Sequence, residues 1–151
     1  MLDSDLLSPG RILANVSINS KKRLLELISL TLAKKNKELD SREIFESLCA
    51  REQLGSTALG NGVAIPHGRI NGTDSVEALF LRLVKPLALD ADDGKPVDLI
   101  FALTVPKNCT EDHSKLLSNI ADRFSDPELL EQLRNAADAN EIGQLLSSSH
   151  P

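Results

Sequence analysis

One histidine of this sequence stands in a setting that suits chemistry. His67 follows Pro66 and precedes Gly68 in the stretch GNGVAIPHGR, residues 60–69, at the end of a short apolar run. The proline fixes its own φ angle and the glycine allows a sharp turn, so the pattern can display an imidazole rigidly at an open surface. An ordinary turn histidine would have the same local sequence, and both interpretations stay open at this point.

Two further side chains could act beside that imidazole. His113 follows the apolar stretch VDLIFALTVP after a short loop. Because sites in α/β sheets gather at the carboxyl ends of strands, we expect His67 and His113 to be neighbours. Arg51 ends an expected helix just before the glycine-rich segment, and its guanidinium can fork two hydrogen bonds to phosphoryl oxygens. Taken singly, His113 also fits a solvated helix start, and Arg51 fits a charge that offsets the helix dipole.

Several chemistries lack the residues that they need. The sequence has no HxH, HxxxH or HExxH pattern for a metal, no GxSxG for a serine hydrolase and no GxxxxGK[ST] phosphate loop. We therefore expect no metal and no cofactor. A lone displayed imidazole suits direct attack on phosphorus, which leaves a phosphoryl group on the ring nitrogen and needs little beyond positioning and positive charge.

The apolar patterning predicts the elements that must position these residues. Helices are expected over 21–35, 41–52, 113–124, 127–136 and 138–146, and strands near 15–18, 56–59, 62–65, 76–84 and 97–105. Expected N-caps are Ser20, Asp40 or Ser41, Thr110 and Asp126, with Pro127 in the first turn of its helix. Asn61–Gly62 indicates a hairpin turn, and the nearly continuous apolar run 97–105 indicates a central strand. The fold class that follows is α/β, a three-layer α/β/α sandwich with a mixed β-sheet flanked by helices.

Composition limits the classes of function. The chain has 151 residues, of which 41% are hydrophobic and 26% charged, as in one globular domain. A net charge of −5 argues against nucleic-acid binding, and no apolar run reaches the ~20 residues that membrane insertion needs. The start MLDSDLLSPGR does not resemble a signal peptide, so we expect a cytoplasmic protein. Cys49 and Cys109 are then expected as free thiols, and His150 as a tail residue.

The stretch EQLGSTALGNGVAIPHG, residues 52–68, resembles the active-site signature of EIIA domains of the mannitol/fructose type, from the bacterial phosphoenolpyruvate-dependent phosphotransferase system. Every position of that signature is matched, by Glu52, Leu59, Gly60, Val63, Ala64, Ile65, Pro66, His67 and Gly68. The stretches SKKRLLELIS and PVDLIFALTVP and the downstream His113 are also similar to this family. The similarity covers about residues 12–147, which implies that residues 1–151 form a single EIIA type-2 domain.

Within that family the sequence is most similar to the nitrogen-related branch, EIIA-Ntr. We expect a free-standing domain without an attached permease, and Asn61 stands where sugar-type members often have an acidic residue. The resemblance implies that His67 is phosphorylated, that His113 is the second active-site histidine, and that Arg51 neutralises phosphoryl charge. It implies as donor a phosphorylated HPr-type carrier, called NPr in this branch and charged from phosphoenolpyruvate. It implies as partners proteins that are regulated through the phosphorylation state, such as potassium-transport or sensor components and metabolic regulators.

Two alternatives remain beside this hypothesis. The first is a sugar-specific EIIA component that passes its phosphoryl group to an EIIB domain. The second is a binding module that keeps the fold but transfers no phosphoryl group. A transient partner would need a shallow apolar rim, for which Leu59, Val63, Ile65 and Ile70 are candidates, although each also suits the core.

Overall fold

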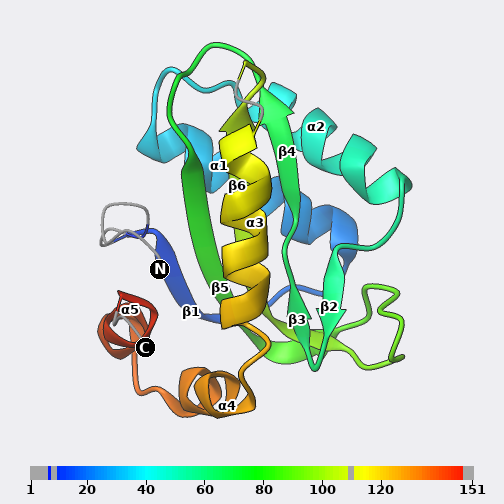
Figure 1. The fold of residues 1–151 in the computed structure, drawn as a ribbon, viewed down its shortest axis with the longest axis vertical. Helices are drawn as coiled ribbons and strands as arrows, with labels where there is room; N and C mark the ends of the chain where they lie inside the picture. The colour runs from blue at the N-terminus through cyan, green and yellow to red at the C-terminus, as the bar shows by residue number, and fades with distance from the viewer. Residues whose placement is uncertain (1–6, 8–9, 109–110, 148–151) are drawn as a thin grey trace.

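A mixed sheet of six strands lies between two layers of helices (Figure 1) in the computed structural model, which describes residues 7, 10–108 and 111–147, the side chains of 111–114 excepted. The strands are β1 (Ile12–Val16), β2 (Ala58–Gly60), β3 (Val63–Ala64), β4 (His67–Ile70), β5 (Glu77–Leu87) and β6 (Val97–Pro106). Their order is β1-β5-β6-β3-β2, and β4 also pairs with β6. The β5–β6 and β2–β3 pairs are antiparallel, whereas β1 joins β5, and β3 and β4 join β6, in parallel.

The helices divide between the two faces of the sheet. They are α1 (Lys21–Lys35), α2 (Ser41–Gln53), α3 (Glu111–Arg123), α4 (Pro127–Asn135) and α5 (Ala139–Ser147). Side chains of α1 and α2 pack on one face, and those of α3, α4 and α5 pack on the other. This arrangement confirms the expected three-layer α/β/α sandwich. Within the described residues, no helix combines the length and the apolar character that crossing a membrane would require.

The two central strands supply both cores because they are apolar on both sides. Along β5, Phe80 faces the α3 side while Leu79 and Leu81 face the α1–α2 side. On the α3 side, the ring of Phe124 lies 6.1 Å from that of Phe80 and 5.5 Å from that of Phe101, measured between centroids. The expectation that 97–105 is a central strand is therefore confirmed.

Local capping signals locate the helix starts. The side chain of Ser20 accepts a hydrogen bond from the backbone nitrogen of Arg23 at 3.2 Å, Asp40 caps α2, and Asp126 caps α4 with Pro127 in its first turn. The expected Asn61–Gly62 turn is present, and both residues have positive φ, 57° and 84°, as a two-residue hairpin between β2 and β3 requires. Thr110 lies outside the described residues.

Two strand predictions need correction. The first strand was expected near 15–18 but spans Ile12–Val16, because Ile12 pairs with Phe80 on β5 and is buried in the α3-side core. The strand β4, His67–Ile70, was not expected at all. It pairs in parallel with β6 and alternates by burying Gly68 and Ile70. Because two of its four residues are a glycine and an arginine, the sequence shows no alternation of apolar and polar residues there.

Candidate functional site

A hollow of about 300 Å³ lies between α3 and the β2–β4 segment of the sheet. It is lined by Arg51, Ser56, Thr57, Ala58, Leu59, Ile65, His67, Leu117, Ser118 and Ala121. The hollow thus gathers the end of α2, the hairpin region and the middle of α3. It brings together His67 and Arg51, which are sixteen positions apart in the sequence.

The backbone fixes which nitrogen of His67 carries the proton. Its Nδ1 lies 2.8 Å from the carbonyl oxygen of Ile65. A carbonyl oxygen can only accept a hydrogen bond, so Nδ1 must be the N–H donor. The neutral ring then has its lone pair on Nε2. This is the arrangement that a nucleophilic imidazole needs.

Burial keeps that ring uncharged near neutral pH. Desolvation lowers the pKa of His67 below its ordinary value of 6.5, and the nearby Arg51 charge lowers it further. The hydrogen bond to Ile65 and the charge of Glu52 raise the pKa of His67, but they offset only part of the effect. The net shift favours the neutral, nucleophilic form.

Arg51 lies in the last turn of α2, as expected, and is half-exposed. Its Nη1 donates to the carbonyl oxygen of Gly55 at 3.0 Å, which anchors the side chain at the mouth of the hollow. None of the ion pairs between described residues involves Arg51. Its positive charge is therefore not neutralised by a neighbouring carboxylate, and it can attract an anionic group in the hollow.

Behind Arg51 lies a polar network that the sequence interpretation missed. The buried carboxylate of Glu52 pairs with Lys21 Nζ at 2.9 Å and accepts a hydrogen bond from the Thr57 hydroxyl. Thr57 lines the hollow, and its carbonyl oxygen accepts from the nitrogen of Ile65 at 3.0 Å. The network thereby links α1, α2 and the loop before β2. Lys21 carries no local signal for this role because it lies 31 positions before Glu52.

Gly68 serves a different purpose from the expected turn. It lies inside β4, opposite Thr104 of β6. A Cβ atom at residue 68 would collide with the Ser47 hydroxyl and come within 3.2 Å of the Ser47 backbone. The absent side chain therefore makes room for α2 rather than for the imidazole.

The remaining predicted residues lie as follows. His113 is in the first turn of α3, one helical turn before Leu117, and its side chain lies outside the described residues. Of the four rim candidates, Leu59 is 45% exposed and lines the hollow, whereas Val63, Ile65 and Ile70 are buried. Cys49 is a free thiol, while Cys109 and His150 lie outside the described residues.

The hollow can hold a small anion against a neutral imidazole and a free guanidinium. Nothing among the described residues forms a group of three or more His, Cys, Asp or Glu side chains that could hold a metal ion. The hollow thus places the Nε2 nitrogen of His67, which can act as a nucleophile, beside the positive charge of Arg51 and the exposed side chain of Leu59.

Comparisons with known proteins agree on one family. A family model described as phosphoenolpyruvate-dependent sugar phosphotransferase system, EIIA 2, matches residues 5–149. The nitrogen regulatory protein of Pseudomonas aeruginosa is 46% identical over 141 residues, which are 93% of this chain and 92% of that protein. The crystal structure of nitrogen regulatory protein IIA-Ntr from Neisseria meningitidis has a TM-score of 0.90 at 42% identity, over 95% of this chain and 98% of that one.

A more distant structure shares the fold. The mannitol enzyme IIA of Escherichia coli, solved by NMR in complex with phosphorylated enzyme IIB, has a TM-score of 0.78 at 17% identity. The similarity covers 93% of this chain and 96% of that one.

Proposed function

The chain belongs to the EIIA 2 family of the phosphoenolpyruvate-dependent sugar phosphotransferase system, and from that premise we propose that it carries a phosphoryl group on His67. The observation that carries the proposal is the hydrogen bond from His67 Nδ1 to Ile65, in a hollow that Arg51 also lines. Together these contacts supply a neutral Nε2 nucleophile beside a free positive charge.

The transfer step exchanges one P–N bond for another. The Nε2 lone pair of His67 forms a bond to phosphorus while the bond from phosphorus to the donor's imidazole breaks. The electron pair of the broken bond stays on the donor ring, and the proton on His67 Nδ1 remains hydrogen-bonded to Ile65. Because both bonds are of the same kind, the exchange is nearly balanced. The site needs only moderate charge to stabilise the transferring group, which Arg51 supplies.

The donor in this proposal is a phosphorylated HPr- or NPr-type carrier protein, and His113 is the second imidazole at the phosphoryl group. The position of His113, one helical turn before a residue that lines the hollow, supports that role. The output is regulation of other proteins, such as potassium-transport or sensor components, through the phosphorylation state. The two similar nitrogen regulatory proteins support this output over sugar transport.

A reconstituted relay tests the proposal. The protein is mixed with an EI-type enzyme, an HPr- or NPr-type carrier and phosphoenolpyruvate, and its intact mass is measured at neutral pH, where the P–N bond survives. We expect one added phosphoryl group in the wild type, none in His67→Ala, and a slower gain at the same site in His113→Ala. No mass gain in the wild type would contradict the proposal and favour a binding module.

A sugar-specific role is the second candidate, because the family description names a sugar phosphotransferase system and the fold matches a mannitol enzyme IIA. Addition of EIIB domains to the phosphorylated protein separates the two roles. Rapid loss of the phosphoryl group to an EIIB domain would favour the sugar-specific component, and retention in their presence supports the regulatory carrier.

A further inference from the structure

One wall of the hollow is a weakly held strand. Ala58 and Leu59 of β2 line the hollow, and β2 is the last strand at its edge of the sheet. Its ladder with β3 comprises two residue pairs, Ala58 with Ala64 and Gly60 with Val63, with an irregularity between them. With one further bond, from the Ile65 nitrogen to the Thr57 carbonyl oxygen, the pairing stays short, and a short two-stranded hairpin is only marginally stable by itself.

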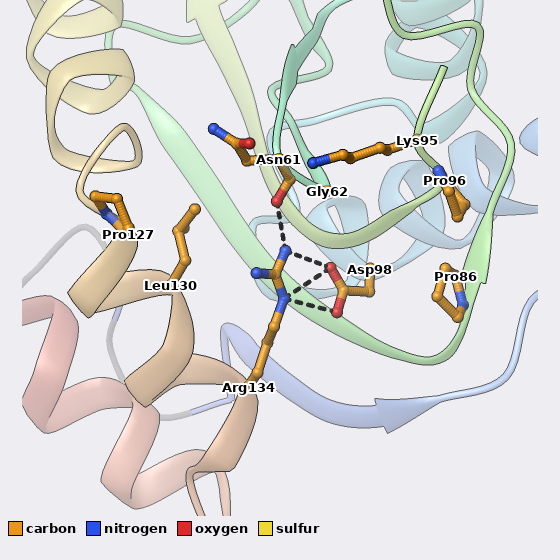
Figure 2. Close-up of a pocket in the computed structure, with 9 residues that line it drawn as sticks. All are labelled: Asn61, Gly62, Pro86, Lys95, Pro96, Asp98, Pro127, Leu130 and Arg134. Atoms are coloured by element: carbon orange, nitrogen blue, oxygen red, sulfur yellow. Dashed lines mark hydrogen bonds and ion pairs between the residues drawn. The ribbon is translucent and has the colours of Figure 1, made fainter. Parts of the chain in front are cut away.

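Contacts from outside the hairpin hold its turn instead. Arg134 Nη2 donates to the carbonyl oxygen of Asn61 at 2.6 Å, and Figure 2 shows the guanidinium reaching the turn from α4. The Asp93 carboxylate accepts a hydrogen bond from the backbone nitrogen of the same residue, Asn61, at 2.8 Å. The carbonyl oxygen of Gly62 accepts from the backbone nitrogens of Asp98 and Leu99, each at 3.0 Å.

The charge of Arg134 is already satisfied, which points to a mechanical role. Its Nε lies 2.9 Å from Asp98 Oδ2 and its Nη2 lies 2.9 Å from Asp98 Oδ1, a two-point ion pair (Figure 2). A guanidinium paired in this way offers little charge to a further anion. It does provide a rigid fork between α4, β6 and the hairpin turn.

The helix that carries Arg134 is itself firmly placed. The buried Arg82 of β5 donates to the carbonyl oxygens of Leu133 at 3.0 Å and Ala136 at 2.7 Å, at the end of α4. Helix α4 follows α3 directly, and Leu117, Ser118 and Ala121 of α3 form the opposite wall of the hollow. Arg134 therefore ties the β2 wall to the helical layer that includes the opposite, α3 wall.

We propose that Arg134 is a positioning residue for phosphoryl transfer, which fixes the distance between the β2 wall and the α3 wall of the hollow. The inference rests on the function proposed above. A partner that delivers its phosphoryl group must enter between these walls. With the turn released, β2 samples more positions, and docking must order it at a cost in affinity. The reacting groups, His67 and Arg51, are untouched.

Kinetics of the transfer separate positioning from general stability. Initial rates of phosphoryl transfer are measured against the concentration of phosphorylated HPr-type donor for wild type, Arg134→Gln and Arg134→Lys. We expect Arg134→Gln to raise the half-saturating donor concentration about tenfold, with the maximal rate within about twofold. Lysine keeps the charge but presents its donors from a single nitrogen, so Arg134→Lys should recover part of the affinity.

Arg11→Gln is the matched control. Arg11 also joins a carboxylate, Glu77 at 2.6 Å, and a backbone carbonyl oxygen, that of Ala78 at 3.4 Å. It lies next to β1, at the opposite edge of the sheet from β2. This variant should lose thermal stability but keep the wild-type dependence on donor concentration. Asp93→Ala changes a residue in an exposed loop and loosens the same turn. It should also raise the half-saturating donor concentration. This variant tests the proposal if Arg134→Gln fails to fold.

Hydrogen exchange supplies a readout that does not depend on transfer. The amide of Ile65 donates to the carbonyl oxygen of Thr57 at the base of the hairpin. Its hydrogen-exchange rate should rise in Arg134→Gln and stay at the wild-type value in Arg11→Gln. If both Arg134→Gln and Asp93→Ala keep the wild-type half-saturating donor concentration, the positioning role is wrong, while the proposed function is unaffected. Absence of transfer in the wild type would overturn the proposed function and this inference together.

Discussion

At the scale of single residues, two features of the fold act on the imidazole of His67. Its tautomer is set by the Ile65 carbonyl oxygen, and its pKa is lowered by burial and by Arg51. Both effects leave Nε2 free to attack. The sequence indicated the residue but not these causes, because neither is encoded in the PHG pattern.

The lowered pKa of His67 predicts the pH range of phosphoryl acceptance. Acceptance needs the neutral ring, so the rate should hold below pH 6.5 and fall only when the pH drops through the lowered pKa. Arg51→Gln removes a charge that lowers the pKa of His67 and should raise it, whereas Glu52→Gln removes a charge that raises it and should lower it. Titration of the His67 ring resonance by NMR measures the pKa of His67 in the wild type and in both variants. A wild-type pKa above 6.5, or shifts of the same sign in both variants, would contradict this account.

The guanidinium of Arg51 should matter most during transfer. In the proposed transfer, Arg51→Ala removes a charge-assisted contact to the transferring phosphoryl group and should cost about 2–3 kcal/mol, or roughly 30- to 150-fold in rate. Single-turnover transfer from the phosphorylated donor measures the effect. Arg42→Ala is the control, since Arg42 is an exposed arginine on the same helix. Equal rates in both variants would reduce Arg51 to a charge at a helix end.

At the scale of elements, the site depends on how closely α2 approaches β4. Ser47 of α2 donates to the carbonyl oxygen of Arg69 at 2.8 Å, directly above Gly68. The same two elements carry Arg51 and His67. The spacing between α2 and β4 thus sets the distance between the Arg51 charge and the His67 imidazole.

Gly68→Ala should therefore disturb both stability and transfer. The added methyl group would press on Ser47, and overpacking of this kind costs about 1–3 kcal/mol of unfolding free energy. Gly68→Ala in a Ser47→Gly background removes the colliding side chain and should recover much of the loss. Urea unfolding and the transfer rate are measured on the single and double variants. Additive losses in the double variant would contradict the proposed contact.

Elements with local signals were predictable, and those that depend on distant partners were not. The capped starts of α1, α2 and α4 follow from neighbours a few positions apart, as in the Ser20 cap that accepts from Arg23. Strand β4 exists because β6 pairs with it, and the bond from Arg134 to Asn61 joins residues 73 positions apart. Apolar periodicity contains no information about such pairs. The family signature contains His67, and Arg51 was a candidate from its place at a helix end and from the family resemblance, but only the fold places both around one hollow.

At the scale of the whole molecule, the carboxylate of Glu77 joins three parts of the chain. It pairs with Arg11 at 2.6 Å and accepts hydrogen bonds from Asn36 at 2.9 Å and Ser75 at 2.8 Å. Burial acts to raise the pKa of Glu77, but these hydrogen bonds and the Arg11 charge outweigh it, so the pKa lies below its ordinary value of 4.5. The folded state therefore binds this proton less readily than the unfolded state.

That difference predicts acid sensitivity of the fold. Because the pKa of Glu77 is lowered on folding, its contribution to stability is complete above pH 4.5 and is lost as the pH falls through the folded-state pKa. Glu77→Gln should be less stable at neutral pH, and its free energy of unfolding should vary less with pH in that acidic window. Urea unfolding between pH 3 and 7 measures both curves. If the free energy of unfolding varies with pH in the same way in wild type and variant, other carboxylates cause the loss of stability in acid.

The hydrogen bond from His67 to Ile65 also determines the isomer of any phosphohistidine formed here. With Nδ1 occupied by a backbone carbonyl oxygen, the adduct must be the tele isomer, 3-phosphohistidine, and the pros isomer, 1-phosphohistidine, has no place. Antibodies that discriminate the two isomers would therefore stain the phosphorylated protein with one reagent and not with the other. A hydrogen bond between residues two positions apart thus decides the chemical identity of the modified side chain.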